Sequence, residues 1–276
     1  VIMQELAYEK KQQYLADYRS LSSWISDRRG VSEVVRKALS ENMTFFKVEG
    51  IVANRNEDSM TQLLSSIYAL NIQISVVFQI ENHKLSAWIG SSYDNGEILQ
   101  GLFTKVIGCK CLEHGLTEEE LFSKKTFCYE NAVVGDAIYK EGHDQSVLDI
   151  LLSGGLFDDC SVVVSAAPLS REMGARISDY FDEVVTEISA ITSRQITSRD
   201  DKDSVTYTEE NGYLKRFEEI VEALKKKYED GRREGLFISS VKIYADSPII
   251  NDLVAGTFLS QSANEEYPEI MQHILL

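Results

Sequence analysis

The stretch that most constrains the fold covers residues 144–168 and reads DQSVLDILLSGGLFDDCSVVVSAAP. Apolar residues between positions 147 and 152 follow helical spacing, and Asp144 is placed to cap the start of this helix. Gly154 and Gly155 end it, because glycine adopts positive φ without a steric penalty. Three valines and two alanines then occupy five of the six positions 162–167, without regular alternation with polar residues. A strand that is apolar on both faces is typical of the centre of a covered sheet.

The composition narrows the class of protein. The chain has 276 residues, of which 43% are hydrophobic, enough for one large or two ordinary domains. Its net charge of −16 argues against a surface that grips DNA and favours basic or apolar protein partners. No apolar run is long enough for a transmembrane helix. Four cysteines without a signal-peptide pattern indicate a reducing cytoplasm.

Residues 1–30 are predicted to form an N-terminal helical arm. The apolar residues that could line one side of it are Leu6, Tyr14, Leu15, Tyr18 and Leu21. Such a helix either covers the protein's own core or packs on a neighbouring subunit, and the first alternative is the more common one.

Residues 31–113 are predicted to form a first α+β unit, a ferredoxin-like split βαβ arrangement. After a helix at 31–39, the pattern runs strand, helix, strand, strand, helix, strand. Asp58 or Ser59 is expected to cap the first helix of this series, and Asp94 with Glu97 to form a capping box on the second. The expected strands cover 44–52, 72–80, 85–89 and 110–112, and the expected helices 58–70 and 94–107.

Residues 114–276 are predicted to form a second α+β unit that contains a helical hairpin at 170–228. A short helix at 117–122 and an edge strand or loop at 127–134 come first. The hairpin has helices at 170–193 and 208–228, joined by a mobile tip at 198–204. A strand at 235–244 follows, and Ser247 with Pro248 starts a helix that ends near Leu259. The residues expected to face inward in the hairpin are Ile177, Tyr180, Phe181, Val184, Val185, Ile188, Ile191, Tyr213, Leu214, Phe217, Ile220, Val221 and Leu224.

This second unit lacks a closing strand in the sequence pattern. Two strands alone make a poor sheet. Residues 127–134, the C-terminal tail or the first unit must therefore supply the rest. The predicted fold class is α+β, with ferredoxin-like split βαβ units and an inserted long antiparallel helical hairpin.

The cysteines offer the main alternative between a metal site and packing. Cys109 and Cys111 lie two residues apart, so on a strand they face the same side. With Cys128, Cys160 and His114 they could bind zinc, but zinc sites usually have two tight cysteine pairs and this chain has one. We therefore predict reduced packing cysteines and no metal ligand.

No catalytic or cofactor-binding residue is predicted. The chain lacks a G-x-x-x-x-G-K-[ST] phosphate loop and a G-x-S-x-G elbow. The acidic clusters at 118–120 and 200–201 are typical of solvated faces. Lysines 225–227 and arginines 232–233 stand at a helix C-terminus, where positive charge complements the helix dipole; a binding role is the less favoured alternative.

Four segments together resemble one family. They read LLSSIYALNIQISVVFQIENHKLSAWIG, QSVLDILLSGGLFDDCSVVVSAAP, EVVTEISAITSRQ and YLKRFEEIVEALKKKYEDGRREGLFISSVKIYADSPIINDLVAGTFLS. Their order over roughly residues 31–276 resembles the region that precedes the motor in HerA-like and FtsK-like ATP-binding proteins, relatives of type IV secretion ATPases. The phosphate loop and the acidic Walker B strand of that family are not in this chain, so no nucleotide-binding residue is carried over.

The resemblance implies a non-catalytic N-terminal assembly or partner-coupling module of an ATP-driven translocase, with DNA as the expected substrate of the translocase. ATP and Mg²⁺ are expected only in a motor domain that follows this chain. Partners would be further copies of the chain, in a hexamer for the full-length protein, and an effector protein. Candidate partner contacts stand at the hairpin tip: Arg199, Asp200, Asp201 and Lys202. Two rivals are a free-standing regulatory domain of ferredoxin-like type that binds a ligand or protein, and, with least support, an enzyme that uses the acidic clusters.

Overall fold

The computed structural model describes residues 9–16, 43–51, 57–82, 84–111, 115–122, 129–135, 159–200, 203–262 and 271–275. This part of the chain is an α+β fold with a large antiparallel sheet, covering helices and a pair of long helices in contact. The chain divides into two compact units. We call residues 1–24 with 171–232 the helical unit, and residues 25–170 with 233–276 the sheet unit.

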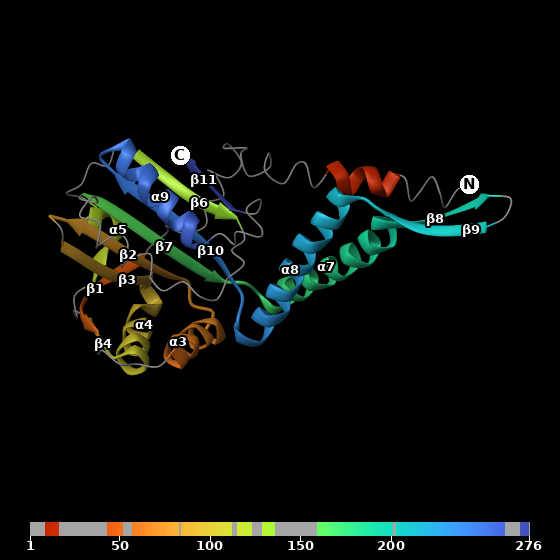
Figure 1. The fold of residues 1–276 in the computed structure, drawn as a ribbon. Helices are drawn as coiled ribbons and strands as arrows, with labels where there is room; N and C mark the ends of the chain where they lie inside the picture. Colours follow the sequence, from red (N-terminus) through yellow and green to blue (C-terminus); the bar gives the residue numbers. More distant parts are fainter. Residues whose placement is uncertain are drawn as a thin grey trace. The chain divides into compact units, whose positions relative to one another are not determined.

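Nine strands in the described residues form the sheet of the sheet unit (Figure 1). Their order is β11-β6-β10-β7-β2-β3-β1-β4, with β5 also paired to β1, and every pair is antiparallel. The strands are β1 (Met43–Ile51), β2 (Ile74–Glu81), β3 (Lys84–Ser92), β4 (Cys109–Cys111), β5 (Leu116–Thr117), β6 (Tyr129–Gly135), β7 (Cys160–Pro168), β10 (Phe237–Ala245) and β11 (Met271–Leu275).

The two halves of this sheet repeat one pattern. In the first half the strands lie in the order β4-β1-β3-β2, and in the second half in the order β11-β6-β10-β7. In each half, the strand that comes first in the chain therefore lies between the third and the fourth. The halves join where β2 pairs with β7, with Val77 opposite Val163. The predicted central strand at 162–167 is thus confirmed, because β7 lies between β2 and β10.

Three segments complete the sheet around the two strands predicted in the second unit. Residues 129–135 form β6, which lies between β10 and β11 and is neither an edge strand nor a loop. The C-terminal tail supplies β11, and the first half supplies β2 as the neighbour of β7. The helices predicted at 31–39 and in residues 144–153 lie outside the described residues.

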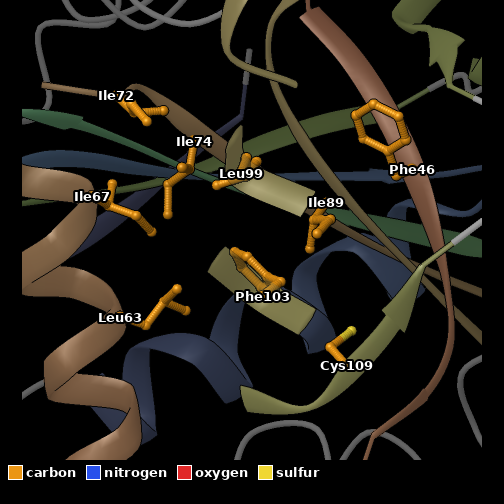
Figure 2. Close-up of a cluster of buried hydrophobic side chains, with 9 residues drawn as sticks. All are labelled: Phe46, Leu63, Ile67, Ile72, Ile74, Ile89, Leu99, Phe103 and Cys109. Carbon is orange, nitrogen blue, oxygen red and sulfur yellow. The ribbon is translucent and has the colours of Figure 1, made fainter. Parts of the chain in front are cut away.

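Two apolar clusters lie on the same face of the sheet. Alternate residues of a strand share a face, so one strand can contribute to both clusters. Ile74 of β2 belongs to the first cluster and Ile80 of the same strand to the second. Helices α3 (Glu57–Ala69) and α4 (Gly96–Leu102) contribute to the first cluster, and α9 (Pro248–Ser262) to the second. The first cluster, drawn in Figure 2, contains Phe46, Leu63, Ile67, Ile72, Ile74, Ile89, Leu99, Phe103 and Cys109. The second contains Ile80, Cys160, Val162, Ile243, Ala245, Val254, Ala255 and Phe258.

The opposite face of the central strands mixes apolar and polar side chains. Met43, Phe45 and Val77 pack there with Leu121 of α5 (Glu118–Phe122). Beside them, the hydroxyls of Ser75 and Ser165 lie 2.5 Å apart. The indole nitrogen of Trp88 donates a hydrogen bond to Oε1 of Gln79 at 3.2 Å. The polar members buried on this face are Ser75, Gln79, Ser161, Ser165, Ser240 and Lys242.

Two helix starts differ from the prediction. Helix α3 begins at Glu57, so Asp58 and Ser59 lie within its first turn and do not precede it. Helix α4 begins after a short 3-10 turn at Tyr93–Asn95, and Asn95 at its N-cap makes no side-chain capping bond. The capping box of Asp94 and Glu97 is therefore wrong. The helical path nevertheless extends to Ile107, through a π-helical turn at Phe103–Ile107, and Gly108 ends it with a φ of 71°.

Candidate interaction site

The core of the helical unit lies between two long helices, α7 (Arg171–Thr192) and α8 (Gly212–Glu234). Their apolar residues repeat at helical spacing, which places one stripe of each helix against the other. Ile188 and Leu214 are fully buried in this contact. The cluster contains Tyr14, Leu15, Val184, Ile188, Leu214, Phe217 and Val221, with Phe181, Val185 and Ile191 packed against it.

The first helix of the hairpin was predicted within one residue at each end, but the second was not. It begins at Gly212, so residues 208–210 are not helical. Two aromatic residues predicted to face inward are also exposed: Tyr180 keeps 61% of its surface and Tyr213 keeps 64%. An apolar stripe read from periodicity is wider than the contact between two helices, so its outermost members remain in solvent.

A third helix, residues 9–16, packs on this pair within the helical unit. Tyr14 and Leu15 are buried in the shared cluster, and the ring of Tyr14 lies 6.1 Å from that of Phe217. Lys10 and the hydroxyl of Tyr14 both donate hydrogen bonds to the carboxylate of Glu187 on α7. These turns of the predicted N-terminal arm therefore cover the core of their own chain.

The polar contact of this helix shifts two ionisation equilibria. Burial, followed by the neighbouring Glu187, raises the pKa of Tyr14 above its usual range. The hydrogen bonds from Lys10 and then Tyr14 lower the pKa of Glu187. Both shifts favour a neutral tyrosine beside an ionised glutamate near neutral pH.

A two-stranded antiparallel ribbon joins α7 to α8 where a mobile tip was predicted. Its strands are β8 (Ser193–Asp200) and β9 (Asp203–Glu210), and Figure 1 shows both continuing from the ends of the two helices. The described residues of 198–204 thus belong to two paired strands and do not form the predicted polar break between helices, and the mobility of the tip stays a prediction. A signal was present in the sequence, because β-branched and aromatic residues around Ile196 and at 205–208 flank an Asp-rich segment.

The ribbon is held at its base. The backbone amide of Asn211 donates to the carbonyl of Thr192 at 3.1 Å, which ties the end of α7 to the start of α8. The side-chain oxygen of Asn211 accepts from the amides of Tyr213 and Leu214 at 3.1 and 3.2 Å. This is N-capping of α8. A two-stranded ribbon is marginally stable by itself, so this anchored base gives it support.

The predicted contact residues fall at the far end of the ribbon from that base. Arg199 and Asp200 are the last two residues of β8, opposite Ser204 and Asp203. Asp201 and Lys202 lie outside the described residues. The structure thus places two of the four candidates on a strand of the ribbon.

Lys225, the first residue of the basic stretch on α8, is paired within the helical unit. The ammonium of Lys225 lies 2.5 Å from the carboxylate of Asp182 on α7 and 3.9 Å from that of Glu229. The hydrogen bond to Asp182 raises the pKa of Lys225. Lys225 therefore crosslinks the two helices. Because α8 runs to Glu234, Lys225 lies outside the last turn of the helix, and the predicted dipole explanation is wrong for this residue.

The cysteines fall into separate clusters. The sulfurs of Cys109 and Cys111 lie 3.7 Å apart on β4, and burial raises the pKa of both thiols. Cys109 packs in the first apolar cluster and Cys160 in the second. Cys128 and His114 lie outside the described residues. Among the residues that the structure describes, no three His, Cys, Asp or Glu side chains gather in a way that could hold a metal ion.

Comparison with known proteins adds no assignment. No family model matches the chain, and no curated protein matches it. Of the helices in the described ranges, none has the length and apolar character needed to cross a membrane.

Proposed function

We propose that this chain is the non-catalytic assembly and partner-coupling module of a HerA/FtsK-like ATP-driven translocase that moves DNA. The observation that carries the proposal is the insertion of the helical unit. The chain leaves the sheet after β7, forms a unit with its own apolar cluster, and returns to the adjacent strand β10. Binding functions are commonly carried by elements added to a widely used fold.

On this proposal each half of the sheet is a ferredoxin-like split βαβ unit, and the helical unit interrupts the second. The strand orders β4-β1-β3-β2 and β11-β6-β10-β7 support this assignment. So does the element order of the first half, in which α3 follows β1 and α4 follows the β2–β3 hairpin.

ATP and Mg²⁺ bind, on the same proposal, in a motor domain of the parent protein and not on this chain. The absence of a phosphate-loop motif from the sequence supports that division. The parent is a cytoplasmic homo-oligomer, a hexamer by the resemblance, and an effector protein binds to it. The net charge of −16 supports a protein partner over direct contact of this chain with DNA.

A ligand-binding regulatory domain is the second candidate, and the polar face of the sheet favours it. Gln79 and Ser161 stand opposite each other where β2 pairs with β7. Nε2 of Gln79 and Oγ of Ser161 are buried, and within the described residues neither has a hydrogen-bond partner. Buried polar groups are normally paired, so a small ligand with acceptor oxygens is one way to satisfy them.

The reading frame of the natural gene tests the two candidates against each other. The motor proposal expects it to continue past Leu276 into a phosphate loop followed by an acidic Walker B strand. A frame that stops at Leu276 would overturn the motor proposal and leave the regulatory domain in the lead. If the frame continues, the parent protein is compared with a variant that lacks residues 171–232, and both the rate of ATP hydrolysis and the mass of the assembled particle are measured. Loss of assembly without loss of the sheet unit's unfolding transition is the expected result.

A further inference from the structure

The outer edges of the β8–β9 ribbon are its most distinctive feature. In the described residues β8 pairs only with β9, and β9 only with β8. Each strand therefore presents one edge whose amide and carbonyl groups make no ladder bond there. Such an edge is a template for pairing with another strand. Eight residues at about 3.3 Å each give an edge of roughly 26 Å.

The two strands differ in charge. β8, SRQITSRD, contains Arg194 and Arg199 against one aspartate. β9, DSVTYTEE, contains three acidic residues, Asp203, Glu209 and Glu210, and no basic one. Opposite charges on neighbouring strands stabilise their pairing, and like charges oppose it. The edge of β8 is therefore complementary to the edge of β9, and neither is complementary to itself.

The direction of the strands leads to the same pairing. When copies stand side by side in a ring with their ribbons pointing the same way, β8 of one copy meets β9 of the next. These strands run antiparallel, as they do within one ribbon. A contact between two different surfaces of identical subunits is the kind that closes into a ring.

We propose that the β8–β9 ribbon is a self-assembly surface, on which the β8 edge of one copy pairs with the β9 edge of a second copy of this chain. This inference rests on the proposed function, because it names the partner of the assembly module. The chain's net charge of −16 opposes close approach of two copies, so the complementary charges of the ribbon decide where they meet.

Charge-reversed pairs of variants test the proposal on the 276-residue chain. The β8-acidic variant carries Arg194→Glu and Arg199→Glu, and the β9-basic variant carries Glu209→Lys and Glu210→Lys. Sedimentation velocity over a range of concentrations measures self-association. Wild type should associate, and each variant alone should associate about tenfold more weakly, since favourable strand pairs become like-charged. An equimolar mixture of the two variants should regain association, because each supplies the edge that the other lacks.

The variant with all four substitutions controls for damage to the ribbon itself. Arg194 stands opposite Glu209 within one ribbon, so either reversal alone places like charges there. The fourfold variant restores that pair with its signs exchanged and should associate as wild type does. A monomeric wild type, single variants that associate like wild type, or a mixture and a fourfold variant that both stay monomeric would each overturn the proposal.

The result is distinguishable from failure of the proposed function. If the 276-residue chain is monomeric but its parent protein contains a working ATPase, the ribbon pairing is contradicted and the motor assignment is not. If the ribbons pair but the reading frame stops at Leu276, the motor assignment is contradicted and the ribbon pairing is not.

Discussion

Val162 and Val163 are neighbours on β7, yet they face opposite sides of the sheet. Val162 is 1% exposed and packs in the second apolar cluster. Val163 is half-buried on the other face, with Val77 and Lys242 as its neighbours across the two ladders. The environment of a side chain on a central strand is thus set by its face as well as by its place in the chain.

An aspartate at these two positions should therefore have unequal effects. Val162→Asp leaves a carboxylate without a partner in the core, at a cost of several kcal/mol against a typical stability of about 5–15 kcal/mol. Val163→Asp should cost less, because its carboxylate stands opposite the cationic Lys242. Chemical denaturation of both variants measures the difference. Equal losses would contradict this assignment of faces.

Gly235 is a position where only glycine fits. Its φ is +116°, and a Cβ there would lie 2.6 Å from Cγ of Tyr68. Gly235→Ala should lower the free energy of unfolding by at least about 1–3 kcal/mol, from backbone strain alone. Gly212→Ala is the matched control, since an added Cβ meets nothing within 4 Å at this first residue of α8. Similar unfolding midpoints for the two variants would show that the strain is absent.

Among the elements, the helix at residues 9–16 depends on charge as well as on packing. Its contact joins Lys10 and Tyr14 to Glu187. The pKa of Glu187 is lowered in the folded state, so this contribution is present above its ordinary value of about 4.3 and is lost as pH falls through the folded value. The pKa of Tyr14 is raised, so its contribution is present below about 10 and is lost at higher pH.

A comparison of wild type with Glu187→Gln isolates this pH dependence. Wild type should be the more stable protein at neutral pH, where Glu187 is ionised. The difference in unfolding free energy should shrink as pH falls below about 4, where the glutamate takes up its proton. Urea unfolding at a series of pH values gives the comparison. A difference that stays constant from neutral to acidic pH would mean that the ionised carboxylate contributes nothing to docking.

The ribbon should be separable from the stability of the helices beneath it. The apolar cluster of the helical unit is built from residues of α7, α8 and the helix at 9–16, and the bond from Asn211 to Thr192 lies at the base of the ribbon. Replacing residues 198–204 with a short Gly-Ser loop should leave the melting temperature unchanged within a few degrees. Calorimetry measures that, and sedimentation measures the loss of self-association expected from a shortened edge. Unchanged self-association would mean that the contact between copies uses only the part of the ribbon near its base.

Elements with strong periodicity could be predicted from the sequence, and those held by distant partners could not. The alternation of Ile74, Val76, Phe78 and Ile80 correctly predicted the strand β2 and the face that these residues share, which packs in the two apolar clusters. The pairing of β6 with β11 joins segments far apart in the chain, and no local pattern encodes such a partner. The ribbon was not predicted, because its two strands are largely polar and lack a continuous apolar stripe. Arg199 and Asp200 were chosen for their charge, and nothing local placed them on an edge of paired strands.

At the scale of the whole sheet, one of the described connections differs strongly between the two halves. In the first half Glu81 at the end of β2 pairs with Lys84 at the start of β3, and Asn82 has a φ of 47°. In the second half the corresponding strands β7 and β10 are joined through the helical unit. The ladder is continuous up to this connection, since Pro168 pairs with Phe237 and the amide of Leu169 donates to the carbonyl of Leu236 at 2.7 Å.

Replacing residues 170–235 with Asn-Gly should therefore convert β7 and β10 into a hairpin like that of β2 and β3. Leu169 and Leu236 already stand in hydrogen-bonding contact, and Asn-Gly favours the two-residue turn that such strands need. Phe237 packs against the first apolar cluster, and the ring of Tyr68 lies 5.8 Å from its ring; both residues remain in the shortened chain. The shortened protein should keep a cooperative unfolding transition and the circular dichroism of an α+β fold with less helix, and it should no longer self-associate. A molten or aggregated product would mean that the sheet needs the helical unit to fold, and that the insertion is part of the core of this protein.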